Sequence, residues 1–225
     1  MSFIVTIDGP AGSGKGTITE QVGERLALIN IDTGAMFRCV TLNMLQEGIQ
    51  VEEENKIKEI LNKIEIKLKE NGEVFLNGKE VTKRIRENDI NHFISPVSMI
   101  PMIREKLLEL QRKMAQGKNI IMEGRDIGTV VFPNADVKIY LDASPEERAK
   151  RRVQQNQEKG ITTSYEEVLK SIKDRDQKDA TRKIAPLRKA EDAIYIDSTN
   201  MTIEEVTDEI VRIVKEKQIH SLNKY

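Results

Sequence analysis

The chain has 225 residues, with 36 basic and 37 acidic side chains and a net charge of −1 at pH 7. This balance excludes a global field that would draw the protein to nucleic acid or to an anionic membrane. The single cysteine, Cys39, excludes an internal disulfide framework. No signal-like or membrane-spanning apolar run is present, so we expect a cytoplasmic protein with no membrane partner.

Short apolar runs with little polar alternation predict strands that are covered on both faces. Between them lie helical patterns, with capping-box starts at Ser144, Ser164 and Thr202 and a helix stop at Gly160. This alternation predicts an α/β fold, a five-stranded doubly wound parallel sheet in a single domain over residues 1–225. The five expected strands span residues 3–8, 27–31, 119–123, 136–141 and 193–197.

The first expected strand enters a glycine-rich loop that ends in Gly-Lys and leads into a helical pattern, the context of a phosphate-cradling P-loop. Lys15 adds a positive charge on the outer phosphates, and the helix N-terminus adds a partial one. Gly16 stands where a hydroxyl residue is usual, so direct metal ligation by Thr17 stays open. The alternative is a flexible glycine turn. The expected ATP-binding residues are Gly9, Pro10, Ala11, Gly12, Ser13, Gly14, Lys15, Gly16 and Thr17.

A second polar cluster, residues 32–38, follows the second expected strand. Ligands of open α/β sheets bind at the carboxyl ends of the strands. We expect Thr33 to cap the next helix and Arg38, on its second turn, to grip a phosphate. The alternative for Arg38 is a solvated surface residue.

Residues 50–92 interrupt the parallel pattern. A charged helical stretch is followed by alternating apolar positions, and hairpin turns are predicted at Asn71-Gly72 and Asn77-Gly78. Antiparallel strands within a parallel-sheet protein predict an inserted subdomain, which often forms a lid or a binding lobe. The alternative is a surface meander without a function.

A third cluster, Glu123 to Asp126, ends the third expected strand. Glu123 follows an apolar strand and so resembles an acid that orients Mg²⁺-bound water. Arg125 and Asp126 carry opposite charges, and a simple salt bridge between them is the alternative to a binding role.

Arginines are spaced regularly in the C-terminal third. Arg148, Arg151 and Arg152 fall on one face of a helix, and more charges follow at residues 175–182. Phosphoryl transfer needs cations on the transferring group, which a mobile helical hairpin can deliver. The alternatives are a solvated charged hairpin and a nucleic-acid-binding patch. Aromatic residues make up 4% of the chain, tryptophan is absent and acids interleave with the bases, all of which argue against nucleic acid.

Two further segments complete the pattern: Val97 to Arg112, with Pro101-x-x-Arg104 and Gln111-Arg112, and Ala185-Pro186-Leu187. With residues 9–17, 32–38 and 123–133, they make the chain resemble the bacterial-type cytidylate kinase family over roughly residues 3–215. The Gly-Arg-Asp-x-Gly-Thr-Val-Val-Phe-Pro run is the most specific of these motifs, because many kinases share the P-loop. The family also carries an antiparallel insertion like residues 50–92.

The resemblance implies Mg²⁺-dependent transfer of the ATP γ-phosphoryl group to CMP or dCMP by a monomer. Residues 50–92 would bind the nucleoside monophosphate, and residues 148–183 would form a lid and the helices that close over substrate. The resemblance further implies catalytic roles for Lys15, Arg125 and Arg151, and a metal site at Thr17 and Glu123, the latter through water. The implied substrate-binding residues are Arg38 and Arg125 for the acceptor phosphate, Thr33, Arg104, Asp126 and Arg182 for cytosine, and Ser95, Arg175 and Asp179 for the sugar.

Two other functions remain open. One is a different small-molecule P-loop kinase, for UMP, dTMP or shikimate. The other is a nucleotide-dependent switch, although the Asn-Lys-x-Asp guanine motif of GTPase switches is absent from the chain. The role of Asp8, at the end of the first expected strand, also stays open.

Overall fold

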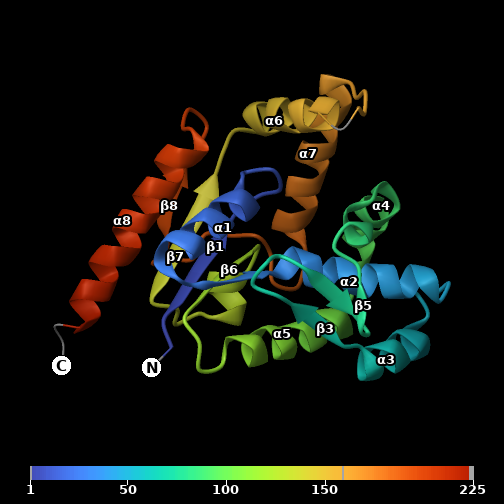
Figure 1. Cartoon of the computed structure of the whole chain (residues 1–225). Helices are drawn as coiled ribbons and strands as arrows, with labels where there is room; N and C mark the ends of the chain where they lie inside the picture. Colours follow the sequence, from blue (N-terminus) through green and yellow to red (C-terminus); the bar gives the residue numbers. More distant parts are fainter. Residues whose placement is uncertain (1, 159, 223–225) are drawn as a thin grey trace. The chain divides into compact units, whose positions relative to one another are not determined.

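The computed structural model describes residues 2–158 and 160–222, which form two compact units (Figure 1). The discontinuous unit consists of the residues up to Asn30 and those from Lys118 onward. The central unit is Ile31–Gly117.

The main sheet has five strands in the order β2-β6-β1-β7-β8. β1 pairs in parallel with both β6 and β7, and β7 pairs in parallel with β8. The predicted α/β fold with a five-stranded parallel sheet is confirmed. The strands are β1 (Ile4–Asp8), β2 (Ile29–Asp32), β6 (Ile120–Gly124), β7 (Val137–Asp142) and β8 (Ile194–Asp197).

β2 begins later than the sequence predicts, because Ala27 and Leu28 do not belong to the strand. Ala27 adopts left-handed backbone with φ 51° and closes the preceding helix, and the N–H of Leu28 donates to the carbonyl of Gly23 at 2.9 Å. An apolar Ala-Leu pair is read as strand from its hydropathy, but here it serves as the end of a helix.

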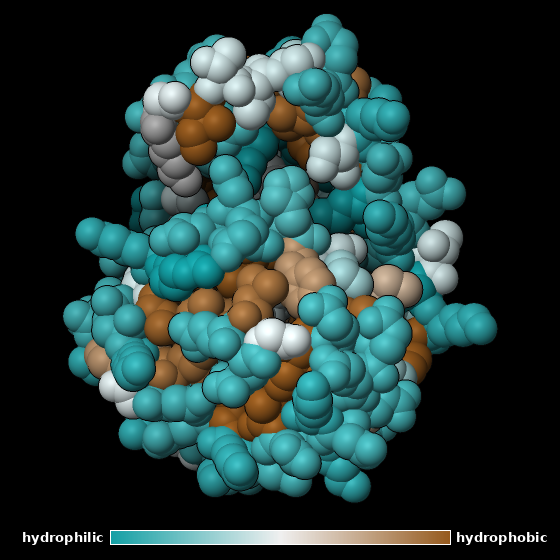
Figure 2. Space-filling model, turned by 90° about the vertical axis from the view of Figure 1, so that its right-hand side faces the viewer, coloured by the Kyte–Doolittle hydropathy of each residue, from teal (hydrophilic) through white to brown (hydrophobic). Residues whose placement is uncertain are grey.

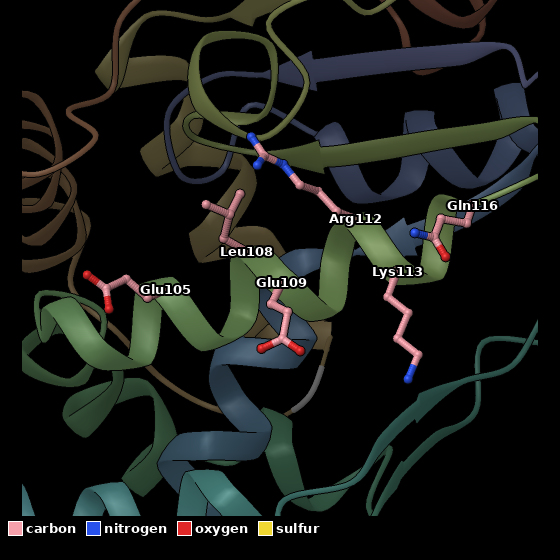
Figure 3. A pocket seen from close by; sticks show the side chains of 6 residues that line it. All are labelled: Glu105, Leu108, Glu109, Arg112, Lys113 and Gln116. Carbon is pink, nitrogen blue, oxygen red and sulfur yellow. The ribbon is translucent and has the colours of Figure 1, made fainter.

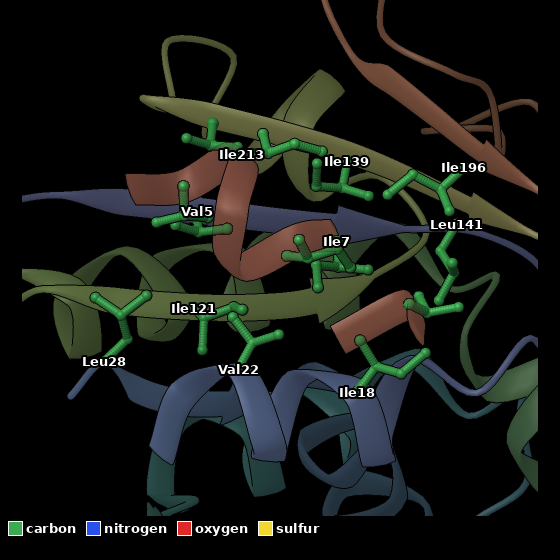
Figure 4. Close-up of a cluster of buried hydrophobic side chains, with 14 residues drawn as sticks. Val5, Ile7, Ile18, Val22, Leu28, Ile121, Ile139, Leu141, Ile196 and Ile213 are labelled. Atoms are coloured by element: carbon green, nitrogen blue, oxygen red, sulfur yellow. The ribbon is translucent and has the colours of Figure 1, made fainter. Parts of the chain in front are cut away.

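The core of the discontinuous unit is aliphatic (Figure 4). Val5 and Ile7 of β1 are 0% exposed and are covered by side chains of the neighbouring strands and of two helices. Ile18 of α1 and Ile213 of α8 belong to the same cluster. The helices of this unit are α1 (Lys15–Leu26), α6 (Pro145–Glu158), α7 (Tyr165–Thr181) and α8 (Ile203–Leu222).

Three predicted helix starts are confirmed by capping hydrogen bonds. The hydroxyls of Ser144, Ser164 and Thr202 each accept from the backbone N–H three residues later, as a capping box requires. The predicted stop at Gly160 is also confirmed, since α6 ends just before it and Gly160 has φ 72°.

The central unit combines helices with a small antiparallel sheet of order β3-β4-β5. Both predicted hairpin turns are confirmed: Gly72 has φ 81°, and Asn77 and Gly78 have φ 49° and 81°. The limits of an inserted subdomain at residues 50 and 92 stay a prediction. The elements are α2 (Thr33–Gln46), α3 (Glu54–Lys63), β3 (Ile66–Leu68), β4 (Val74–Leu76), β5 (Lys79–Glu80), a 3-10 turn η1 (Arg84–Arg86), α4 (Asn88–Val97) and α5 (Pro101–Ala115).

The predicted cap of α2 is wrong. Thr33 is the first residue of the helix, and Asp32 is its N-cap, with the side chain accepting from the N–H of Ala35 at 2.9 Å. Both Asp and Thr are good N-cap residues. Here the earlier one takes the role, and Thr33 is left buried on the first turn.

Hydrophilic residues dominate the face shown in Figure 2, with hydrophobic residues visible between them. Among residues 2–158 and 160–222, no helix combines the length and the apolar character that a membrane crossing needs.

Candidate functional site

The glycine-rich loop lies between β1 and α1, the strand and helix that the motif requires. Gly12 and Gly14 have φ 79° and 89°, backbone that turns successive N–H groups toward one side. Gly9 is required by a close approach: a Cβ there would lie 2.0 Å from the carbonyl oxygen of Leu141 on β7. The loop is therefore pressed against the neighbouring strand.

Lys15 begins α1 and is 5% exposed. Its Nζ donates to the carbonyl of Pro10 at 2.7 Å and to the hydroxyl of Ser13 at 3.4 Å. Burial, followed by the charge of Arg125, lowers the pKa of Lys15, while Glu123 and Asp8 oppose that change. An anion close to Lys15 would oppose this decrease of its pKa.

Glu123 lies directly over the start of α1, because a Cβ on Gly16 would come within 3.1 Å of its Oε1. The glycine after Lys15 thus leaves room for this carboxylate. Thr17, one residue further, is exposed. A carboxylate and a hydroxyl suit Mg²⁺, which completes its shell with water and substrate phosphates. The described residues hold no group of three or more His, Cys, Asp or Glu side chains that could bind a metal ion.

After β6 the chain forms η2 (Ile127–Val131), a π-helical turn in which the N–H of Phe132 donates to the carbonyl of Ile127 at 2.7 Å. The carboxylate of Asp8 accepts from the first two N–H groups of this turn. Such turns are frequent at functional sites. The sequence analysis did not predict this turn.

Arg125 and Asp126 do not form an isolated salt bridge with each other. Arg125 Nε lies 3.0 Å from Asp179 Oδ2, and Arg182 Nη2 lies 3.4 Å from Asp126 Oδ1. All four side chains are at most 20% exposed. Arg182 also donates to the carbonyl of Ala185 at 2.5 Å. The end of α7 and the loop after β6 therefore form one charged network.

The arginines of α6 have three different environments. Arg148 is 3% exposed in its side chain; its guanidinium pairs with Asp176 of α7 at 2.6 Å and donates to the carbonyls of Ala143 and Ala11. Arg151 pairs with Glu147 and donates to the carbonyl of Ser198 at 2.7 Å. Arg152 is exposed. Arg148 thus ties the two helices to the glycine-rich loop, a role that sequence reasoning missed.

In the central unit, Arg38 donates from Nη1 to the carbonyl of Ile85 at 3.1 Å and to Asn91 Oδ1 at 2.6 Å. Arg104 donates to the carbonyl of Ser98 at 3.1 Å.

Two neighbours of these arginines were missed by sequence reasoning. Asn91 orients Arg38 from 53 positions away along the chain, and the ring of Phe37 lies 5.4 Å from the guanidinium carbon of Arg104. Contacts so distant in sequence leave no local signal.

The site residues thus form two sets, one in each unit. The discontinuous unit brings together Lys15, Glu123, Arg125, Asp126, Arg175, Asp179 and Arg182. The central unit holds Thr33, Arg38, Ser95 and Arg104.

A separate depression of about 530 Å³ runs along α5 in the central unit (Figure 3). None of the expected site residues lines it. Its lining residues are Glu105, Leu108, Glu109, Arg112, Lys113 and Gln116.

Comparisons with known proteins identify the fold and the family of the chain. Solved structures share the fold alone: a gluconokinase from Sinorhizobium meliloti is 11% identical with a TM-score of 0.52, covering 99% of this chain and 98% of its own. A "Cytidylate kinase" from Caldicellulosiruptor bescii is 49% identical over 212 residues, 93% of this chain and 94% of the relative. One from Fusobacterium nucleatum is 46% identical over 214 residues, 95% of this chain and 98% of the relative. Since the family model "Cytidylate kinase" also matches residues 5–216, the chain belongs to the cytidylate kinase family.

Proposed function

We propose that the protein transfers the γ-phosphoryl group of ATP to CMP or dCMP, giving ADP and the nucleoside diphosphate. The observation that carries the proposal is the juxtaposition, in the discontinuous unit, of the buried Lys15 with Arg125 and the network around Asp126. Two cationic side chains, Lys15 and Arg125, therefore lie near each other and near the buried carboxylate of Asp126. Relatives named cytidylate kinase at 46–49% identity support the choice of substrate.

The donor would be held by the loop from Gly9 to Thr17, with Lys15 on the transferring group. Mg²⁺ would be held by Thr17 and, through water, by Glu123, and it would neutralise charge on the triphosphate. Arg151 would act as a further cation once its contacts with Glu147 and Ser198 are exchanged. The buried Arg148 is suited to keep the helices in place.

The acceptor phosphate would be bound by Arg38 and Arg125. In the base subsite, Asp126 would accept from the exocyclic amine of cytosine. Because Asp126 is 7% exposed, a substrate that offered no donor to its carboxylate would leave a buried polar group unpaired, at a cost in binding free energy. The remaining residues proposed for the acceptor are Thr33, Arg104 and Arg182 for the base and Ser95, Arg175 and Asp179 for the sugar.

The reaction requires no general base, because the attacking atom is an oxygen of a phosphate that is already anionic. Catalysis then depends on holding donor and acceptor in line and on placing cations where charge develops. Because Lys15 is buried, its charge would be little screened by water and would interact strongly with a phosphate bound beside it. We further propose that the enzyme is a cytoplasmic monomer.

The decisive experiment is an ADP-release assay with ATP, Mg²⁺ and one acceptor at a time: CMP, dCMP, UMP, dTMP, AMP, shikimate or none. We expect CMP and dCMP to be the best acceptors. Higher activity with any other acceptor would replace the proposal with a different small-molecule kinase. ADP release that needs no acceptor would indicate a nucleotide-dependent switch.

A further inference from the structure

Asp8 occupies the point where two functional loops leave adjacent strands. It is the last residue of β1, directly before the glycine-rich loop, and it lies opposite Gly124 in the pairing of β1 with β6. Gly124 directly precedes Arg125 and Asp126. Asp8 is 4% exposed, so its carboxylate must find its hydrogen-bond partners within the protein.

Both carboxylate oxygens of Asp8 are committed to the second loop. Oδ1 accepts from the N–H of Ile127 at 2.8 Å, and Oδ2 accepts from the N–H of Gly128 at 2.7 Å. The first N–H groups of a helical turn have no partner within it. The two-pronged contact therefore fixes the position and the orientation of the turn that follows Arg125 and Asp126.

Close packing around Gly128 also holds the turn against β1. A Cβ on Gly128 would lie 3.0 Å from Thr6 Oγ1, 3.2 Å from Lys138 Cδ and 3.3 Å from Asp8 Oδ2. The turn is thus seated against β1 as closely as its backbone allows. A side chain at position 128 would therefore have to shift the turn or these neighbouring side chains by a few tenths of an ångström.

The arrangement is costly for stability, which argues for a functional purpose. Burial raises the pKa of Asp8 to about 6, against the effect of the two N–H groups, and the charge of Asp126 adds to the rise. Lys15 lies near enough to oppose it. A strand end that only had to cover the core would use an apolar residue.

We propose that Asp8 is a positioning residue that sets the separation between the loop binding the phosphoryl donor and the residues Arg125 and Asp126 that bind the acceptor. This inference rests on the proposed function. Asp8 touches neither substrate; it acts through the backbone of Ile127 and Gly128. Its loss would leave both substrates bound but poorly aligned for in-line transfer.

The test replaces Asp8 by Asn, which has the same shape but turns an NH₂ group toward one of the two backbone N–H groups. With the best acceptor from the assay above, we expect kcat to fall about 10- to 100-fold, as an ångström-scale misplacement does. KM for ATP and for the acceptor should stay within about threefold, because the binding side chains remain.

A second measurement separates positioning from plain structural support. In the wild type, the amount of phosphorylated acceptor should equal the amount of ADP released from ATP. In Asp8→Asn, the amount of ADP should exceed that of phosphorylated acceptor, because water competes with the misaligned acceptor for the phosphoryl group. Gly128→Ala, which pushes the turn away from Asp8, should give the same pattern and serves if Asp8→Asn does not fold.

The matched control is Thr6→Val. Thr6 lies two residues earlier on β1, its buried hydroxyl has no hydrogen-bond partner among the described residues, and it also borders Gly128. Its kcat and its product ratio should equal those of the wild type. The proposal is overturned if Asp8→Asn and Gly128→Ala lose melting temperature but keep wild-type kcat and product ratio, or if only KM for ATP rises. A wild type that phosphorylates no acceptor would refute the proposed function instead.

Discussion

The carboxylate of Asp126 has two partners, one observed and one proposed. Its Oδ1 lies 3.4 Å from Arg182 Nη2, and it is the proposed hydrogen-bond acceptor for the cytosine amine. Asp126→Asn should lower kcat/KM with CMP by about 10- to 100-fold, the cost of an unsatisfied buried polar pair. Uracil offers an oxygen where cytosine offers an amine, so the ratio of CMP to UMP activity should narrow. Steady-state kinetics on both nucleotides measure this.

The control for that experiment is Arg125→Met, which should leave the ratio unchanged because Arg125 is proposed to contact only phosphate. An unchanged ratio in Asp126→Asn would mean that Asp126 merely orients Arg182. Activity would then fall equally on both substrates.

Arg38 and Arg125 are both proposed to bind the acceptor phosphate. Replacing either by Met should lower kcat/KM for CMP by about 10- to 100-fold, as expected for a charged hydrogen bond worth about 1.5–3 kcal/mol. The affinity for ATP, measured by calorimetry, should change little. Arg212→Met, on the exposed side of α8, is the control and should behave as the wild type. Equal losses for ATP and CMP would make these arginines structural.

The raised pKa of Asp8 should make the free energy of unfolding depend on pH. Burial raises the pKa of Asp8 from its ordinary 3.8 to about 6, so the folded state holds the proton more tightly than the unfolded chain. Raising the pH from 4 to 6 should therefore lower the free energy of unfolding through this group by about 2 kcal/mol. Urea unfolding of the wild type and of Asp8→Asn should show their difference shifting in favour of Asn over that window. A pH-independent difference would contradict the raised pKa.

At the scale of elements, the end of α1 offers a stabilising change. Ala27 is exposed and has φ 51°, a conformation that disfavours every residue with a Cβ. Ala27→Gly should raise the free energy of unfolding by about 0.5–1 kcal/mol, with the greater freedom of glycine in the unfolded chain already subtracted. Thermal unfolding should show a melting temperature about 2–3 °C higher.

The opposite result is expected inside a helix. Ala180 is exposed in the last turn of α7, and Ala180→Gly should destabilise the protein, by less than the roughly 1 kcal/mol expected in a helix interior. If both glycines destabilise, the backbone at Ala27 is not strained.

The elements that could be predicted from the sequence are those whose signals are local. The P-loop spacing, the capping boxes and the two Asn-Gly turns each lie within a few residues, and the structure confirms them. Where two local signals compete, as at Asp32 and Thr33, spacing alone could not choose the cap. The contacts of Asn91 with Arg38 and of Asp8 with the turn after β6 could not be predicted from the sequence, because they join segments that lie far apart along the chain.

For the molecule as a whole, binding should appear as added stability. A ligand at about 100 times its dissociation constant stabilises the folded state by about 2.7 kcal/mol, which for a chain of this size raises the melting temperature by about 5–10 °C. Mg-ATP and CMP should each give such a shift in thermal unfolding, and UMP at the same concentration a smaller one.

Lys15→Met provides the control. It should remove the shift with Mg-ATP, keep the shift with CMP and lower turnover by about three or more orders of magnitude, because the charge on the transferring group is lost. Near-normal turnover in this variant would overturn the role of Lys15. Lys118→Met, at an exposed position, should keep both shifts.

The division of the chain has a consequence during synthesis. β1 emerges first, but the side chain of Asn119 that accepts from the N–H of Phe3 comes 116 positions later. At about 5–20 residues per second, the ribosome needs roughly 6–23 s to supply it. For that time Val5 and Ile7 have no sheet to enter, while the whole of Ile31–Gly117 is made. The glycine-rich loop is thus translated well before the strands beside it and acquires its structure only after they have been made.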